Sequence, residues 1–196
     1  MILKRVFDLI LSSIGFIVCL PVMLIVSIAI RRSMGAGVIF SQKRPGLHGR
    51  IFKMYKFRTM VHFDKNSIKS DDERITSLGK FLRASSLDEL PGLINVIKGD
   101  MSLVGPRPLL VDYLEKYTPT EMRRHDALPG MTGLAQVRGR NNLSWRHKFK
   151  YDIFYVDHQN IYFDIRILIE TVMVVLLRRG FRSHGELRRF DESETK

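Results

Sequence analysis

The sequence predicts a helix-dominated α+β protein in which an apolar N-terminal membrane helix precedes a domain on the membrane surface. Three observations predict this class. Residues 9–30 carry no charge, residues 38–60 contain short β-like stretches, and residues 87–98 have apolar side chains at helical spacing. The net charge of +12 over 196 residues indicates a polyanionic partner, such as a nucleic acid, an anionic membrane or a phosphorylated substrate.

The uncharged segment 9–30 is as long as a membrane-spanning helix, which needs about 20 residues. A cleavable signal peptide is disfavoured, because its apolar core would span only about 7–15 residues. Basic residues lie on both sides, at positions 4, 5, 31 and 32, which favours the cytoplasm for both ends. Pro21 lies near the middle and predicts a kink. A re-entrant helix and a kinked ordinary span therefore both remain open.

Short β-like stretches on either side of Pro45-Gly46 predict a β-hairpin within residues 38–60. Aromatic residues in its second half alternate with basic ones, which indicates a basic face: Lys53, Lys56 and Arg58. Nucleic-acid binding can use this pattern, but a solvated charged face is commoner, so no nucleic-acid partner is expected. The polar segment 62–76 predicts a loop or a short helix.

Apolar residues at helical spacing, followed by Lys98-Gly99, predict an amphipathic helix over about residues 87–98. Asp88 and Glu89 lie in its first turn. Ser86 and Glu89 match a capping box, so the acidic pair has a structural explanation. A helix start nearer Leu90 would free both carboxylates, which could then bind one hard cation such as Mg²⁺. The spacing alone leaves both explanations open.

Arginines in the surrounding segments can each donate two hydrogen bonds to a phosphate: Arg83, Arg107, Arg138 and Arg140. Residues 129–141 contain three glycines beside Gln136, and we expect a loop that a ligand can approach closely. Carboxylates and arginines together are consistent with a metal-assisted phosphate site.

The C-terminal part predicts one more helix, over residues 163–181. Its apolar run after Glu170 is too short to cross a membrane, so the helix lies either in the membrane interface or in the core. The charged residues 183–196 predict a disordered tail. The expected division is thus a membrane helix (1–32), a membrane-associated domain (33–182) and this tail.

Four segments, in this order, closely resemble the bacterial sugar transferases, the monotopic phosphoglycosyl transferases: KRVFDL (4–9), FSQKRPGLHGRIFKMYKFRTM (40–60), RITSLGKFLRASSLDELPGLINVIKGDMSLVGPRP (74–108) and PGMTGLAQVRGRN (129–141). The resemblance covers most of the chain, and its LDELP…GPRP part is highly specific. It implies transfer of a phosphosugar from a UDP-sugar to a polyprenyl phosphate, usually undecaprenyl phosphate, with release of UMP. This would be the first membrane step of glycoconjugate assembly.

The resemblance also implies a monotopic protein on the cytoplasmic face of the bacterial inner membrane, bound to phospholipid through its re-entrant helix. No four-helix region precedes the catalytic part, as in the short members of the family, which often use N-acetylated sugars. The oligomeric state is left open, with a homodimer as one possibility.

Residue by residue, the resemblance makes Asp88 the nucleophile that carries the phosphosugar and Glu89 its partner, with Mg²⁺ bound at this pair. It assigns phosphate contacts to Arg83 and Arg107. It assigns contacts with the nucleotide end of the donor to three further residues: Gln136, Arg138 and Arg140.

Pro21 matches the break of the family's re-entrant helix, although Leu20 stands where a serine is common. Gly92 likewise replaces a commoner glutamine, which leaves the role of that position open. Two other functions remain as alternatives: a membrane-anchored binding module without catalysis, and a glycosyl transferase that releases UDP.

Overall fold

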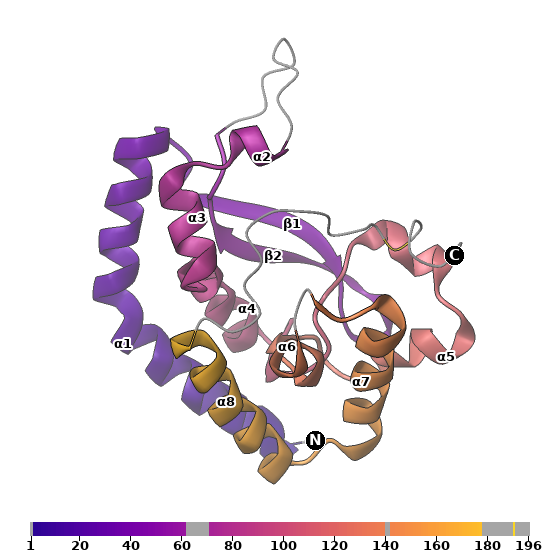
Figure 1. Ribbon diagram of the computed structural model, residues 1–196. Helices are drawn as coiled ribbons and strands as arrows, with labels where there is room; N and C mark the ends of the chain where they lie inside the picture. The colour runs from indigo at the N-terminus through magenta and orange to yellow at the C-terminus, as the bar shows by residue number, and fades with distance from the viewer. Residues whose placement is uncertain (1, 62–70, 140–141, 178–189, 191–196) are drawn as a thin grey trace.

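The computed structural model describes residues 2–61, 71–139, 142–177 and 190. A long helix runs along one side of the molecule, and a small body of short helices and strands lies against it (Figure 1). The predicted helix-dominated α+β class is confirmed. In chain order the elements are α1 (Ile2–Met34), β1 (Ile39–Pro45), η1 (Leu47–Gly49), β2 (Ile51–Phe57), α2 (Asp71–Arg74), α3 (Ser77–Ala84), η2 (Leu87–Gly92), α4 (Leu93–Lys98), β3 (Ser102–Val104), η3 (Val111–Lys116), α5 (Pro119–Met122), η4 (Arg123–Asp126), β4 (Gly130–Thr132), α6 (Leu134–Arg138), α7 (Trp145–His158) and α8 (Ile161–Leu176).

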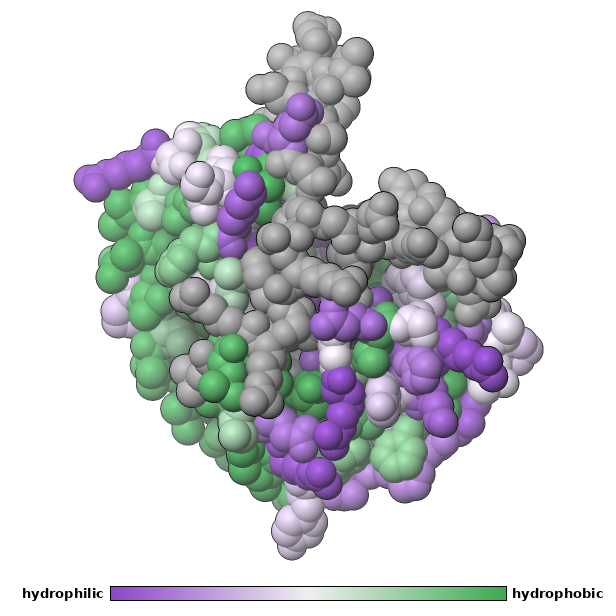
Figure 2. All heavy atoms as spheres, in the orientation of Figure 1, coloured by the Kyte–Doolittle hydropathy of each residue, from purple (hydrophilic) through white to green (hydrophobic). Residues whose placement is uncertain are grey.

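Helix α1 contains Pro21 and changes direction part-way along its length (Figure 1). Its second half buries Met23, Val26 and Ile30 against the body. Most of its other apolar side chains are exposed, and Figure 2 shows a hydrophobic surface along the side of the molecule that α1 occupies. Among the described helices, α1 alone has the length and hydropathy to cross a membrane. An exposed apolar surface of this extent favours contact with lipid.

Strands β1 and β2 form the predicted hairpin, which is confirmed. They pair antiparallel, from Ile39 opposite Phe57 to Pro45 opposite Ile51. The turn between them is a short 3₁₀ helix, η1, in which His48 has a φ of 51°. Strand β2 packs against η2, and the hairpin thereby supports the segment that carries the two adjacent carboxylates.

The helix predicted over residues 87–98 is divided into two parts. Residues Leu87–Gly92 form the 3₁₀ helix η2, and a regular α-helix, α4, begins at Leu93. Pro91 explains the division, because it lacks the N–H that the interior of an α-helix requires. The capping-box explanation is wrong: Ser86 has a left-handed backbone, with φ 58°, and its side chain makes no capping hydrogen bond.

Residues 129–141 were expected to be a loop, and this expectation is wrong for most of the segment. Strand β4 pairs parallel with β3, with Ser102 opposite Gly130, and helix α6 follows. Glycines allow the two backbones to approach, since a Cβ at Gly130 would lie 2.1 Å from the backbone N of Gly105. Strands of three residues are too short to leave a recognisable pattern in the sequence.

Helix α8 has one buried face and one exposed apolar face. It buries Asp164 and Ile167 completely, whereas Ile169, Val172 and Met173 are exposed. One face therefore belongs to the core, and the other adds to the apolar surface beside α1 (Figure 2). The predicted tail 183–196 lies outside the described residues except Phe190, whose ring packs against four aromatic rings of the body: Tyr113, Tyr117, Trp145 and Phe149.

A buried polar network fastens α1 and α8 to β3. Lys4 Nζ donates hydrogen bonds to Asp164 Oδ2 (2.5 Å) and to the carbonyl of Val104 (3.2 Å). Tyr155 Oη donates to the other oxygen of Asp164 (2.7 Å) and to the same carbonyl (2.9 Å). Asp8 accepts from the backbone N–H of Leu103 (3.1 Å). Strand β3 is thus held by side chains of α1 and α7, immediately before Gly105, and Asp164 of α8 fixes two of these side chains.

Candidate active site

Asp88 is a buried carboxylate, 8% exposed, in the first turn of η2. In the part of the chain that the structure describes, no group donates a hydrogen bond to it or forms an ion pair with it. Burial, together with the negative charge of Glu89, raises the pKa of Asp88 to about 6. Its oxygens are therefore available to a ligand, and near neutral pH the carboxylate form predominates.

Glu89 has the opposite environment, although it is the next residue. Its Oε1 accepts hydrogen bonds from Lys56 Nζ (2.7 Å) and from an Arg107 Nη (2.8 Å). Burial on its own would raise the pKa of Glu89, but the charges of Arg107 and Lys56 outweigh it and hold that pKa well below its usual range. In return, the charge of Glu89 raises the pKa of Arg107. Glu89 therefore stays ionised and positions two cations beside Asp88.

The backbone around Arg107 is held in place from two sides. Arg124 donates a hydrogen bond to the carbonyl of Arg107 (2.7 Å), and Arg44 donates one to the carbonyl of Pro108 (3.4 Å). Arg124 is itself buried and paired with Asp152 (2.7 Å). Arg107 therefore projects from a rigid segment, as a residue that must meet a phosphate in a fixed geometry requires.

Arg83 approaches the pair from α3. Its Nε donates to the hydroxyl of Thr59 (3.0 Å), and its charge is close enough to lower the pKa of Asp88 slightly against the dominant effect of burial. Arg83 and Arg107 thus both lie close enough to the carboxylate of Asp88 to act on its charge. Sequence reasoning missed Lys56, because an ion pair between residues 33 positions apart leaves no local signal.

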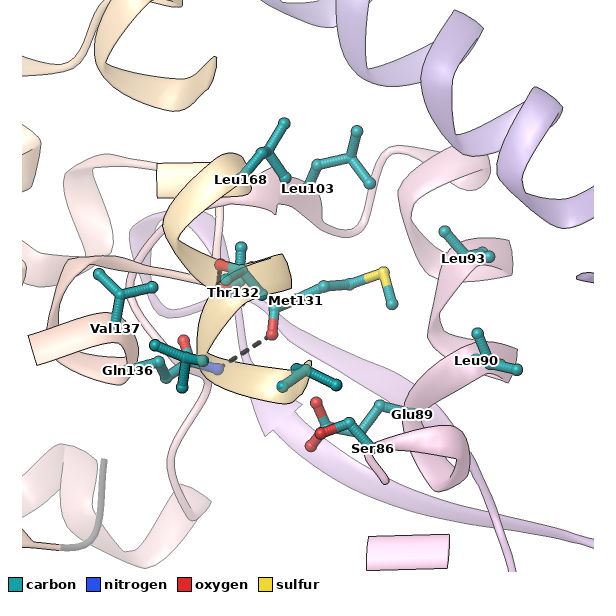
Figure 3. A pocket seen from close by; sticks show the side chains of 13 residues that line it. Ser86, Glu89, Leu90, Leu93, Leu103, Met131, Thr132, Gln136, Val137 and Leu168 are labelled. Carbon is teal, nitrogen blue, oxygen red and sulfur yellow. Dashed lines mark hydrogen bonds between the residues drawn. The ribbon is translucent and has the colours of Figure 1, made fainter. Parts of the chain in front are cut away.

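A pocket of about 210 Å³ opens beside Glu89 (Figure 3). Leu90 and Leu93 line one side, and Gln136 and Val137 line the other. Most of its remaining lining is aliphatic and comes from β3, β4 and α8, namely Leu103, Met131, Leu168, Val174 and Val175, with Ser86, Thr132 and Thr171 as polar members. The pocket is thus an apolar cavity whose lining includes the ionised carboxylate of Glu89.

Of the three residues expected at the nucleotide end, the structure describes Gln136 and Arg138, which line different cavities. Gln136 donates to the carbonyl of Met131 (3.0 Å), and its buried Oε1 has no hydrogen bond within the described residues. Arg138 lies 3.6 Å from Glu170 and lines a second cavity of about 310 Å³. Arg140 lies outside the described residues. Only Gln136 shares a pocket with Glu89.

A magnesium ion fits the chemistry of this donor set. Asp88 supplies an unpartnered carboxylate, and Glu89 keeps its second oxygen free of the described hydrogen bonds. Three potential ligands from His, Cys, Asp or Glu do not gather anywhere in the described chain. Mg²⁺ commonly binds proteins through one or two carboxylates and completes its shell with water and substrate phosphates, so a third protein ligand is not required.

Comparison with known proteins extends to nearly the whole chain. The sequence model of the family described as bacterial sugar transferase matches residues 1–178. The sugar transferase EpsL of Bacillus subtilis (strain 168) is 48% identical, and the alignment covers 98% of both chains. The undecaprenyl-phosphate galactose phosphotransferase of Salmonella typhimurium is 41% identical over 91% of this chain and 41% of its own length.

The UDP-glucose:undecaprenyl-phosphate glucose-1-phosphate transferase of Klebsiella pneumoniae is 38% identical over 88% of this chain and 40% of its own length. The chain therefore spans nearly all of EpsL but less than half of these two longer relatives. Because both the family match and the alignments include the segment with the two carboxylates, this protein belongs to the bacterial sugar transferase family.

Proposed function

We propose that this protein transfers a phosphosugar from a UDP-sugar to undecaprenyl phosphate and releases UMP, through a covalent intermediate on Asp88. One observation carries the proposal: Asp88 is buried and unpartnered among the described residues, while its neighbour Glu89 is neutralised by Lys56 and Arg107. The substrates are supported by the names of the relatives from Salmonella and Klebsiella, which include undecaprenyl phosphate and, in the second, UDP-glucose.

In the first step a carboxylate oxygen of Asp88 attacks the β-phosphorus of the UDP-sugar. A new O–P bond forms, and the bond from that phosphorus to the bridging oxygen breaks, so that its electron pair leaves with UMP. In the second step a phosphate oxygen of the lipid attacks the same phosphorus, and the aspartyl O–P bond breaks to restore the carboxylate. Carboxylates are known to carry phosphoryl groups in this way, with ping-pong kinetics.

The cations beside Asp88 fit the charge that such a transfer develops. Glu89 holds Arg107 and Lys56 through hydrogen bonds, and the charge of Arg83 also acts on Asp88. Fixed positive groups stabilise phosphoryl transfer because they need no reorganisation as charge builds up. Mg²⁺ at Asp88 and Glu89 would supply further neutralisation of the donor's diphosphate.

The apolar surfaces support a lipid acceptor and a membrane location. The pocket beside Glu89 is mainly aliphatic, and the exposed faces of α1 and α8 lie next to the body that contains it. We propose that α1 is re-entrant and leaves both of its ends in the cytoplasm, with the bend and Pro21 near the turning point. The names of the relatives mention galactose or glucose, so an N-acetylated sugar has no support from them.

Labelling of an introduced cysteine tests this placement of α1. A cysteine in place of Ile2 should react with a membrane-impermeant maleimide only from the cytoplasmic side of oriented vesicles, and so should one in place of Gly35. Reaction of position 2 from the opposite side would establish an ordinary span. In a Pro21→Ala background we expect the helix to straighten towards that span.

Mass spectrometry of the intact protein tests the chemistry. The wild type is incubated with UDP-glucose, UDP-galactose or their N-acetylated forms in the absence of a lipid acceptor. We expect UMP release equal to the amount of enzyme and a phosphosugar adduct on Asp88, with Asp88→Asn as the unreactive control. UDP as the product would identify a glycosyl transferase, and the absence of any nucleotide product with all sugars and acceptor present would favour a binding module.

A further inference from the structure

Two cations near Arg107 have no carboxylate partner among the residues that the structure describes. The first is Arg44, at the end of β1, in the FSQKRPG stretch. Its Nη1 donates to the carbonyl of Pro108 (3.4 Å) and its Nη2 to Gln42 Oε1 (2.6 Å). Its Nε is buried without a hydrogen bond, and among the described residues no acidic side chain forms an ion pair with it. The guanidinium of Arg44 thus keeps an N–H donor, at Nε, for a further partner.

The second cation is Lys148 of α7. Its Nζ lies 4.3 Å from the centre of the Trp145 ring. Asp152 lies one turn further along the same face, but it is occupied by Arg124 (2.7 Å). Arg124 in turn bonds the carbonyl of Arg107 (2.7 Å), so this face of α7 is turned towards the Arg107 segment. Within the described chain, Lys148 has no ion pair of its own.

The electrostatics agree with this geometry. Burial and the nearby positive charge of Arg107 lower the pKa of Arg44 to about 10, and the same two causes lower the pKa of Lys148. Two further cations therefore lie near Arg107, and of the three only Arg107 has an acidic partner within the described chain, Glu89. Such crowding disfavours the folded state unless an anion offsets it, and a phosphate is suited to cationic groups in this arrangement.

The second cavity offers a contrast, because its cations are largely neutralised. Glu170 lies 2.9 Å from Arg166 and 3.6 Å from Arg138, and only Lys150 among the three basic residues of the lining has no ion pair in the described structure. An anion gains less there than beside Arg44. The balance of charge therefore favours the Arg44 side for a phosphate.

We propose that Arg44 and Lys148, together with Arg107, bind the phosphate of the nucleoside monophosphate that leaves in the first step. The assignment rests on the proposed function. It places the nucleotide phosphate with a group of residues different from Gln136 and Arg138. Arg107 then contacts the donor diphosphate, and Arg44 and Lys148 bind the phosphate of the departing nucleotide. Glu89 and Arg107 thereby connect this site with Asp88.

Direct binding of UMP and of uridine to the full chain in lipid nanodiscs tests the assignment by calorimetry, without turnover. We expect Arg44→Gln and Lys148→Gln each to weaken UMP binding by on the order of 10-fold to 100-fold, the effect of losing one hydrogen bond to a charged group. Uridine binding should not change, because uridine has no phosphate. Lys43→Gln on the same strand and Lys150→Gln on the same helix remove one positive charge each, and both should leave the UMP affinity unchanged.

Several outcomes would overturn the proposal. Equal loss of UMP and uridine affinity in Arg44→Gln would reveal general damage to the pocket, and weaker UMP binding in Arg138→Gln or Lys150→Gln alone would place the phosphate in the second cavity. If Arg44→Gln does not fold, Lys148→Gln decides, since Lys148 is only half-buried. UMP release is assayed in parallel. If both variants turn over and bind UMP as tightly as the wild type, the proposed phosphate site is wrong and the proposed reaction stands. If UMP binding depends on Arg44 but the wild type releases no UMP, the proposed reaction is wrong and the phosphate site stands.

Discussion

Two regions of the molecule bury carboxylates, and they treat them in opposite ways. In the network between α1, α7 and α8, Asp164 is fully buried and each of its oxygens accepts a hydrogen bond, one from Lys4 and one from Tyr155. In η2, Asp88 is almost as deeply buried, yet no described group donates to it. A buried polar group without a partner costs stability, and a fold keeps one where a ligand supplies the missing contacts.

The difference separates a carboxylate that holds the fold together, Asp164, from the one that we propose acts in catalysis, Asp88. Glu89 belongs to neither extreme, because it is paired like Asp164 but holds its cations beside Asp88. Substitutions of Asp88, Glu89 and Asp164 should therefore change activity and stability to different extents. The two aspartates give the clearest contrast.

The largest effect is expected for Asp88→Asn. The variant keeps the shape of the side chain but lacks the proposed nucleophile, so UMP release should fall by on the order of 10³-fold or more. The melting temperature should not fall, because burial makes the ionised Asp88 unfavourable at neutral pH. A large drop in melting temperature with proportional loss of activity would contradict the contrast and make Asp88 a structural residue.

Asp164→Ala should show the reverse pattern. It leaves the ammonium of Lys4 and the hydroxyl of Tyr155 without their partner, which typically costs about 3–5 kcal/mol of unfolding free energy for a buried pair. Chemical denaturation in detergent, followed by the fluorescence of Trp145, measures this loss. Asp157→Ala is the matched control on α7, because Asp157 pairs with Arg123 at the surface, where an ion pair contributes only about 0–1 kcal/mol. Equal effects of the two substitutions would show that the network does not stabilise the fold.

The smallest and most specific effect concerns pH. If ionised Asp88 is the nucleophile, kcat/KM should rise with pH and level off above an apparent pKa of about 6. In Glu89→Gln the residual activity should have its acid limb at lower pH, because the negative neighbour that raises the pKa of Asp88 is gone. An acid limb that does not move would exclude Asp88 as the group that titrates.

Stability should respond to pH in the opposite direction. The folded-state pKa of Asp88 is raised from 3.8 to about 6, so the protonated side chain favours the folded state. This contribution is fully present below pH 3.8 and disappears as the pH rises through about 6. The difference in stability between Asp88→Asn and the wild type should therefore grow in favour of the variant over that interval.

Local patterns in the sequence were sufficient for part of this arrangement. Alternation and a Pro-Gly turn predicted the hairpin, and apolar spacing predicted a helix around Asp88 and Glu89. The left-handed backbone of Ser86, which removes the cap, is a local conformation that residue type does not determine. The pairing of β3 with β4 and the ion pairs of Lys56 and Lys4 join distant segments, and such contacts leave no periodicity along the chain.

The ion pair between Lys4 and Asp164 also has a consequence for biosynthesis. The two residues are 160 positions apart, so at about 5–20 residues per second the ribosome adds Asp164 roughly 8–32 s after Lys4. During this time α1 can already enter the membrane. The carbonyl of Val104 meanwhile lacks the hydrogen bond from Tyr155, and Lys4 lacks the carboxylate of Asp164 that holds it beside this carbonyl. The strand that leads to Arg107 is therefore fully fastened only when α8 emerges, although Asp8 can bond Leu103 earlier. Nascent chains should therefore be inserted in the membrane but inactive. They should begin to consume nucleotide sugar only when translation is almost complete.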